Sequence, residues 1–205
     1  MILIGYSGHA FVVYGILKAA GHTITGYCDR EEKKQNPFQL PYLGMENSEN
    51  AIEAMVQNGC FIAVGDNRIR RNIFDQLVIK GIQINNAIHP KSVVDSTAII
   101  ALRGVMIAPN VTINPLAKIG SGAICNTGCI IEHECELGNF SHIGPGAVLC
   151  GNVIVGDGSF IGANAVIRQG IRIGKNAMIG AGAVVIKDVP ENSLITGNPG
   201  MPRTI

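Results

Sequence analysis

The sequence predicts an α/β domain over residues 1–86, with a small parallel sheet resembling half of a Rossmann fold, followed by a solenoid of short parallel strands over residues 87–205. Two observations support this prediction. Short aliphatic runs alternate with longer amphipathic runs in the first part, which is typical of strands joined by helices. From about residue 87 the spacing of the aliphatic residues changes to six, which an α-helix does not produce.

The elements of the first part follow one another in a regular order. Strands are predicted at residues 1–5 (MILIG), 23–29 (TITGYCD) and 60–66 (CFIAVGD), and helices at residues 9–21 and 67–81, closed by Gly21 and Gly81. Strand, helix and strand in this order imply a parallel sheet with right-handed crossovers.

The second part keeps one large aliphatic residue in every six. Of fourteen successive positions thirteen are Ile, Leu or Val and Cys125 is the exception; they are Ile107, Ile113, Ile119, Cys125, Ile131, Leu137, Ile143, Leu149, Val155, Ile161, Ile167, Ile173, Ile179 and Val185. The next residue is often glycine, and the residue two places before is usually small. One large and one small inward residue on each flat side, followed by a glycine-tolerant corner, predict a three-sided coil.

Charge and composition exclude several kinds of partner. The chain has 16 Lys and Arg against 15 Asp and Glu, so neither nucleic acid nor an anionic membrane is an expected partner. Residues 1–21 are apolar, but Gly5, Gly8, His9 and Lys18 interrupt them, and they do not resemble a signal peptide. We expect a cytoplasmic protein without a membrane span and with free thiols. The weaker alternative to free thiols is a zinc site that uses Cys125, Cys129 and a nearby histidine.

An acid-base cluster interrupts the repeat at His133, which stands between Glu132 and Glu134. His133 lies two residues past the inward-facing Ile131, at an expected corner of the coil, so its side chain should point outward. An imidazole with an ordinary pKa near 6.5 can take a proton from an amine or a hydroxyl at neutral pH. We expect Glu134 to orient the imidazole, and Glu132 is the alternative.

The first strand and the first helix are joined by a glycine-rich loop that contains Gly5, Ser7, Gly8 and His9. Backbone N–H groups at the start of a helix suit a phosphate, and a plain tight turn is the alternative interpretation. Asp29 ends the second strand, where an acidic residue commonly meets a ribose or a base. Asp66 and Asn67 end a later strand at the same edge, where they either line the pocket or cap the following helix.

Several motifs together resemble one enzyme family. They are GYSGHA near the start, GDN, HP, the segment NTGCIIEHECELGNFSHIGPGAVLCG at residues 126–151, the repeated IGxGA pattern and ITGNP near the end. The chain resembles the hexapeptide-repeat sugar O-acyltransferase and sialic acid O-acetyltransferase family, and within it the N-acetyltransferases that act on nucleotide-linked 4-amino sugars. The resemblance implies a left-handed parallel β-helix, a homotrimer with active sites between neighbouring β-helices, acetyl-CoA as donor and an N-terminal domain that holds the nucleotide.

The resemblance also implies roles for particular residues. His133 matches the general base, and Asn126 and His142 match positions near the acceptor or the thioester. Family members often carry two acidic residues at the end of the second strand, where this chain has Asp29 followed by Arg30.

Stacked coils place residues 18 apart above one another. Gly151 should therefore lie one coil from His133, and Ala163 should stack on Ala181. Small residues at these positions would leave backbone groups open to the pantetheine arm of CoA. Three cations further along the coil are candidates for the CoA phosphates: Arg168, Lys175 and Lys187.

Three other functions remain open from the sequence. The same machinery serves an O-acetyltransferase that acts on sialic acid or another sugar. A β-helical zinc lyase needs three histidines for each zinc, and the coil carries only His89, His133 and His142, without a close pair. A scaffold without catalytic activity would not bind CoA. The N-acetyltransferase without a metal is the function that we expect.

Overall fold

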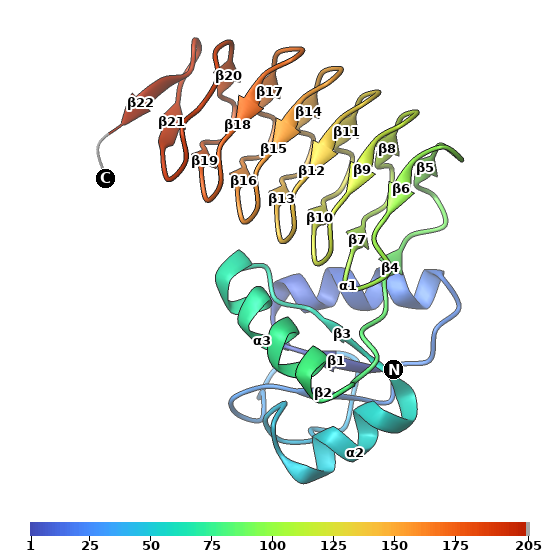
Figure 1. Cartoon of the computed structure of the whole chain (residues 1–205). Coiled ribbons are helices and arrows are strands. Elements are labelled where there is room, and N and C mark those ends of the chain that lie inside the picture. Colours follow the sequence, from blue (N-terminus) through green and yellow to red (C-terminus); the bar gives the residue numbers. More distant parts are fainter. Residues whose placement is uncertain (204–205) are drawn as a thin grey trace.

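The computed structural model describes residues 1–203 and begins with a small α/β domain (Figure 1). Its sheet is parallel, as the sequence predicted, with the strand order β2-β1-β3, and helices lie on both of its faces. The strands are β1 (Ile2–Ile4), β2 (Gly26–Cys28) and β3 (Cys60–Ile62), and the helices are α1 (Gly8–Ala19), α2 (Glu49–Asn58) and α3 (Asn67–Ile79). Within residues 1–203, no helix is both long and apolar enough to cross a membrane.

The two predicted helices form for the expected reasons, and a third was missed. On α1 the buried residues Ala10, Val13 and Leu17 recur at helical spacing. Helix α3 is capped by Asp66, whose carboxylate accepts a hydrogen bond of 2.8 Å from the N–H of Ile69. Helix α2 was not predicted because it buries only a narrow stripe, formed by Ala51 and Met55.

The remainder of the chain winds into a parallel β-helix with three faces, which confirms the predicted fold class. Face 1 consists of β4 (Ala87–Ile88), β7 (Met106–Ile107), β10 (Ile124–Cys125), β13 (His142–Ile143), β16 (Phe160–Ile161), β19 (Met178–Ile179), β21 (Leu194–Thr196) and the antiparallel β22 (Met201–Arg203). Face 2 consists of β5 (Val93–Val94), β8 (Thr112–Ile113), β11 (Ile130–Ile131), β14 (Val148–Leu149), β17 (Val166–Ile167) and β20 (Val184–Val185). Face 3 consists of β6 (Ile99–Ile100), β9 (Lys118–Ile119), β12 (Glu136–Leu137), β15 (Ile154–Val155) and β18 (Arg172–Ile173).

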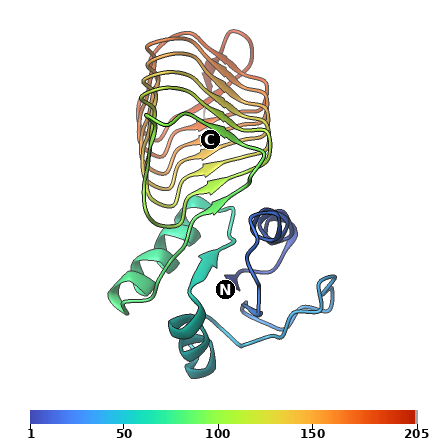
Figure 2. The same cartoon turned by 90° about the vertical axis from the view of Figure 1, so that its right-hand side faces the viewer.

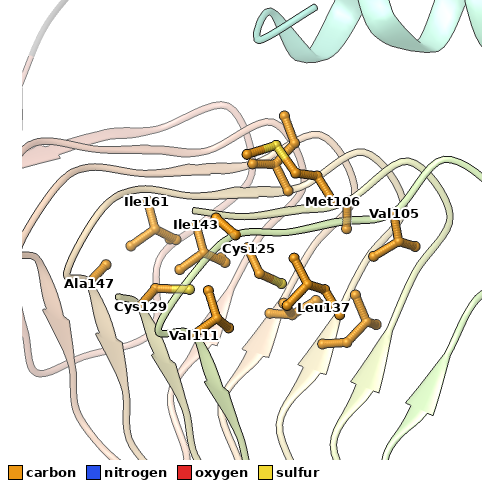
Figure 3. Packing of buried hydrophobic residues seen from close by; sticks show 14 of the residues in the cluster. Val105, Met106, Val111, Cys125, Cys129, Leu137, Ile143, Ala147 and Ile161 are labelled. Atoms are coloured by element: carbon orange, nitrogen blue, oxygen red, sulfur yellow. The ribbon is translucent and has the colours of Figure 1, made fainter. Parts of the chain in front are cut away.

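The period of six gives three strands per coil and a register of 18 residues between coils. Cys125 pairs with Ile143, one coil further along the same face. The inward aliphatic residues are buried, and Cys125 and Cys129 lie among them as small apolar residues (Figure 3). The prediction of a coil from the spacing of these residues is therefore confirmed.

The corners of the coil recur between the same faces, and we name them by the faces they join. Corner 1–2 follows face 1, corner 2–3 follows face 2, and corner 3–1 follows face 3. Glycines at corner 3–1 allow successive coils to approach closely. A Cβ atom added at Gly156 would lie 2.6 Å from the backbone nitrogen of Lys175 in the next coil.

The α/β domain packs beside face 1 and corner 3–1 of the β-helix (Figure 2). The fully buried Arg70 on α3 makes the central contact, because its guanidinium donates to the carbonyl oxygens of Gly122 (2.8 Å) and Phe140 (3.1 Å) in the β-helix. Asn67 adds a hydrogen bond of 2.9 Å from Nδ2 to the carbonyl oxygen of Gly158. The two domains therefore share a polar interface in addition to apolar contacts.

A histidine from each domain meets at this interface. The rings of His9 and His142 are 6.2 Å apart, and the ring of Phe160 packs against His142 at 4.9 Å. Burial lowers the pKa of His142 to about 3 and that of His9 to about 4, and the positive charge of Arg70 acts in the same direction on both. Both imidazoles are therefore neutral in the folded protein at neutral pH.

We expect the Gly156→Ala substitution to destabilise the β-helix by about 1–3 kcal/mol, because the new methyl group would force the next coil apart. Urea unfolding measures the change. The matched control is Gly15→Ala on the exposed side of α1, where a Cβ meets nothing within 4 Å and alanine should raise the free energy of unfolding. Equal effects of the two substitutions would contradict the tight corner.

Acid should destabilise the protein through His9 and His142. Their folded pKa values lie below the unfolded value near 6.5, so the unfolded chain binds more protons between about pH 6.5 and pH 4. The stabilisation is complete above pH 6.5, and about 1.4 kcal/mol per histidine should be lost for each pH unit below it. Urea unfolding at pH 7 and pH 5 measures the loss, which should be smaller in His142→Asn; the same loss in a variant with both histidines replaced would refute this origin.

Candidate active site

His133 and Glu134 lie together on corner 2–3, between β11 and β12. The backbone of Glu134 is left-handed, with φ of 60°, and this sharp corner turns both side chains outward. His133 Nδ1 is 3.1 Å from Glu134 Oε2, and both side chains are about half exposed (50% and 57%). A proton on Nδ1 that is held by the carboxylate would leave Nε2 free to accept a proton from a substrate.

Gly151 lies directly beside the imidazole in the next coil. A Cβ atom at this position would lie 2.5 Å from both Cε1 and Nε2 of His133, so the absence of a side chain makes room for the ring. Asn152 N–H donates to the carbonyl oxygen of His133 at 2.8 Å and fixes the two coils relative to each other. The N–H of Gly151 donates no hydrogen bond to any acceptor among residues 1–203.

A second group of expected site residues lies on or beside corner 1–2. Asn126 Nδ2 is 3.2 Å from His142 Nε2, and His142 is buried on β13. Ala163 and Ala181 follow β16 and β19 on the same corner. Their backbone N–H groups find no acceptor within the described part of the chain.

The structure therefore does not bring all the expected residues together within one chain. Corner 2–3, with His133 and Gly151, lies opposite face 1 of the three-sided coil. A face of six residues at about 3.3 Å each is on the order of 15–20 Å wide, so His133 is far from Asn126 and His142. Residues from the two corners can meet only if they come from different copies.

The N-terminal domain contains a cavity of about 580 Å³ at the carboxyl ends of its strands. Ser7, Asp29 and Arg30 line this cavity, as the sequence suggested, and Asp66 lines it in addition to capping α3. Its other lining residues include Met45, Glu46, Ile69, Asn72, Ile73 and Gln76. The cavity opens beside the first turn of α1, where backbone N–H groups suit a phosphate.

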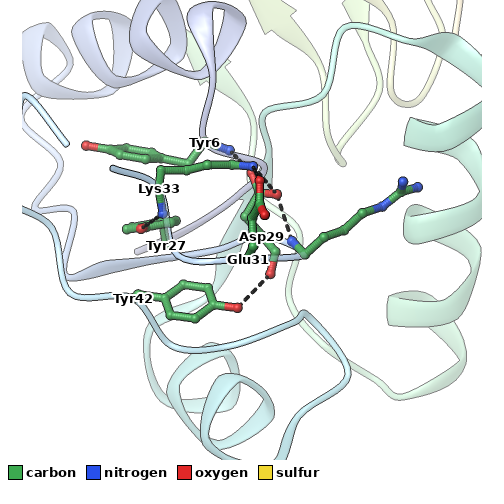
Figure 4. A network of polar contacts seen from close by, with 7 residues as sticks. Tyr6, Tyr27, Asp29, Glu31, Lys33 and Tyr42 are labelled. Atoms are coloured by element: carbon green, nitrogen blue, oxygen red, sulfur yellow. Dashed lines mark hydrogen bonds and ion pairs between the residues drawn. The ribbon is translucent and has the colours of Figure 1, made fainter. Parts of the chain in front are cut away.

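Asp29 holds the glycine-rich loop in place (Figure 4). Its carboxylate accepts hydrogen bonds from the N–H of Tyr6 (2.8 Å) and the N–H of Arg30 (2.7 Å), and it forms an ion pair of 3.2 Å with Lys33. Tyr42 donates its hydroxyl proton to the carbonyl oxygen of Asp29 at 3.1 Å. The carboxylate therefore shapes the glycine-rich loop, which the sequence did not indicate.

Gly8 and His9 have positions different from those of the other loop residues. Gly8 is the first residue of α1. His9 lies next to Gly65 and faces His142 across the domain interface, and no hydrogen bond reaches its buried Nε2 within residues 1–203. A role for His9 in holding the acceptor stays a prediction.

A second cavity of about 670 Å³ adjoins the first and lies beside face 1, since Gly65 and Asp66 line both. Arg68 and Arg71 from α3 and Phe160 from the coil also line it. Sequence reasoning missed both arginines, although their spacing of three residues places them on one side of a helix. The two cavities therefore adjoin at the domain interface, and two cations line the second one.

The cations that we considered for the CoA phosphates are exposed. Arg168 and Lys187 lie near corner 2–3, further along the coil than His133, whereas Lys175 lies on corner 3–1. Only the first two therefore share a corner with the catalytic candidate. Over the described residues 1–203, no three His, Cys, Asp or Glu side chains form a group that could hold a metal ion.

Comparisons with known proteins agree with this geometry. Residues 1–77 match the family described as the PglD N-terminal domain, and residues 134–169 and 152–187 match the bacterial transferase hexapeptide repeats. A GDP-perosamine N-acetyltransferase from Escherichia coli O157:H7 is 35% identical over 94 residues, which are 46% of this chain. The match spans 42% of that relative, less than half of its length.

Two solved structures align with nearly the whole chain. An alanine variant of the GDP-perosamine N-acetyltransferase from Caulobacter crescentus, in complex with CoA and GDP-perosamine, is 34% identical with a TM-score of 0.92, covering 100% of this chain and 96% of its own. The acetyltransferase domain of PglB from Neisseria gonorrhoeae FA1090, in complex with acetyl coenzyme A, is 32% identical with a TM-score of 0.90, covering 98% of each chain. By this likeness over its full length, the chain belongs to the hexapeptide-repeat sugar acyltransferases, in the group of the nucleotide-linked amino-sugar N-acetyltransferases.

Proposed function

We propose that this protein transfers the acetyl group of acetyl-CoA to the amino group of a nucleotide-linked 4-amino sugar. The observation that carries the proposal is the His133–Glu134 pair, which stands on the outside of the coil beside a glycine. The Caulobacter relative holds both CoA and GDP-perosamine, which supports this pair of substrates. The relatives' N-acetylation favours an amine over a hydroxyl as the acceptor.

The proposed reaction uses groups at corner 2–3. The amine attacks the thioester carbonyl, and His133 Nε2 takes the proton that the amine loses. Glu134 holds the other ring nitrogen and stabilises the imidazolium. The free N–H of Gly151 is a donor for the oxyanion that forms on the carbonyl oxygen. When the tetrahedral intermediate collapses, the thiolate of CoA leaves and the imidazolium can return the proton.

The separation of the two corners supports a homotrimer. The nucleotide cavity lies in the α/β domain and adjoins a second cavity beside face 1, whereas His133 lies on the opposite corner of the same chain. A complete site would combine the cavity, Asn126 and His142 of one copy with His133 and Gly151 of another. Closed three-fold symmetry gives every copy the same pair of contacts.

The same proposal includes the boundary between the two domains at residue 86 and the cellular compartment of the protein. Residues 1–86 would hold the nucleotide, and residues 87–205 would bind acetyl-CoA along the backbone groups of Ala163 and Ala181. We place the protein in the cytoplasm, where acetyl-CoA and nucleotide-linked sugars are available.

Replacing the base should slow the chemical step. We expect His133→Ala to lower kcat by roughly 10²–10⁴-fold, the usual contribution of a positioned proton acceptor, with little change in acetyl-CoA affinity. Glu134→Ala should cost less, and the double variant should be far from additive because the two side chains act as one unit. CoA release measures the rate.

The matched control is His22→Ala, which removes an exposed histidine of the α/β domain. It should leave kcat unchanged. Near-normal kcat in folded, trimeric His133→Ala protein would remove His133 as the base and direct attention to His142.

Mixed trimers test whether the site is shared between copies. Asp29→Ala should raise KM for the acceptor selectively, because the loop at Tyr6 loses its clamp. At an acceptor concentration well below the raised KM, co-expression of Asp29→Ala chains with His133→Ala chains should restore activity in about a quarter of the sites, since each such site joins an intact cavity to an intact histidine.

Native mass spectrometry identifies the mixed trimers, and light scattering gives the mass of the wild-type assembly. Mixed trimers without recovered activity would show that both residues serve the same site within one chain. A monomeric mass at working concentration would contradict the assembly itself.

A further inference from the structure

The cavity of the N-terminal domain has both apolar and polar side chains in its lining. Met45 lines it from the turn that precedes α2, and Ile69 and Ile73 line it from α3. Polar side chains line the same cavity: Glu46 on the turn, and Asn72 and Gln76 on the helix. Apolar walls with a few polar groups at the edge are typical of sites that recognise a base.

Three carboxylates line this cavity, and two of them are already engaged. Asp29 accepts hydrogen bonds from two backbone N–H groups and pairs with Lys33. Asp66 accepts the capping hydrogen bond at the start of α3. Within residues 1–203, Glu46 alone of the three has no hydrogen bond and no ion pair, although it is half-buried.

The backbone around Glu46 is fixed. The hydroxyl of Ser48 donates to the carbonyl oxygens of Leu43 (3.1 Å) and Met45 (2.8 Å), and the N–H of Asp29 donates to the carbonyl oxygen of Gly44 (3.2 Å). Gly44 has a positive φ of 91°, and a Cβ there would lie 2.8 Å from the Ser48 hydroxyl oxygen. The turn therefore presents Glu46 from a constant position beside the end of β2.

The negative charge of Glu46 also acts at the end of β2. Burial raises the pKa of the Cys28 thiol to about 12, and the charges of Glu46 and Asp29 add to this shift. Glu46 lines the same cavity as Asp29, the residue that follows β2, so it borders the strand end, where a base is expected to lie when the phosphates occupy the loop before α1.

We infer that Glu46 reads the base of the acceptor and selects guanine. The inference rests on the proposed function, in which this cavity holds the nucleotide. A carboxylate can only accept hydrogen bonds, and it can accept two that lie side by side. Guanine offers such a pair in N1–H and the 2-amino group. Uracil and thymine place a single N–H between two carbonyl oxygens, which a carboxylate repels, and adenine offers one donor beside an acceptor.

Binding of free nucleoside diphosphates to the full chain tests the inference by calorimetry. Wild-type protein should bind GDP about 10–100-fold more tightly than UDP, dTDP or ADP, because a site that is built around hydrogen bonds rejects partners that lack them. IDP, which lacks the 2-amino group, should bind about tenfold more weakly than GDP, since one hydrogen bond to a charged group is lost. In Glu46→Gln, the ratio of GDP to UDP affinity should fall at least about tenfold, because an amide matches the N–H and carbonyl oxygen of uracil.

The matched control is Glu53→Gln on the exposed side of α2, which should leave every ratio unchanged. An unchanged ratio in Glu46→Gln, or a wild-type preference for UDP, dTDP or ADP, would overturn the inference. A second assay distinguishes the failure of this inference from the failure of the proposed function. It measures acetyl transfer to GDP-linked and to UDP-linked amino sugars separately, by the release of CoA from acetyl-CoA. If the protein binds GDP selectively but transfers no acetyl group, only the proposed function is refuted. If it acetylates GDP-linked and UDP-linked amino sugars equally well, only the role of Glu46 is refuted. If it binds no nucleotide, both are refuted.

Discussion

The buried guanidinium of Arg70 decides where the α/β domain sits on the β-helix. Its donors reach the backbone carbonyls of Val64 and Gly65 at the end of β3, and also those of Gly122 and Phe140 in two successive coils. A buried charge without such partners would cost several kcal/mol, so the guanidinium holds these carbonyls in one arrangement. The contact also fixes the border between the two cavities, because the carbonyl oxygen of Gly65 accepts one of these hydrogen bonds and Gly65 lines both cavities.

The architecture could be predicted from the sequence because it repeats. An aliphatic residue at every sixth position, with small residues and glycines at fixed offsets, leaves few folds other than a three-sided coil. The proximity of His133 to Glu134 and to Gly151 followed from the same register. In the α/β domain the order of the elements was correct, but α2 was missed because two buried residues in ten carry little periodic signal.

The remaining features depend on contacts between distant segments, which no local pattern encodes. Arg70 and Arg71 look alike in the sequence, yet one is fully buried between the domains and the other lies with its guanidinium 4.9 Å from the ring centroid of Phe140. The glycine-rich loop suggested a phosphate site, but its dependence on the Asp29 carboxylate appears only in three dimensions. The separation of His133 and His142 could not be predicted for the same reason. Nine residues are half a coil, so His133 lies on corner 2–3 and His142 on the opposite face 1.

The fixed register of 18 residues also restricts how such a chain can change its length during evolution. Each coil returns a residue to the same corner, as Cys125 and Ile143 illustrate on face 1. An insertion of 18 residues would lengthen the solenoid and keep every later side chain on its own corner. An insertion of six would keep the inward pattern intact, yet it would rotate everything that follows by one face. After such an insertion between them, Arg168 would lie on a different corner from His133, although the core would remain well packed. A change in length can therefore abolish the function without lowering the stability of the fold.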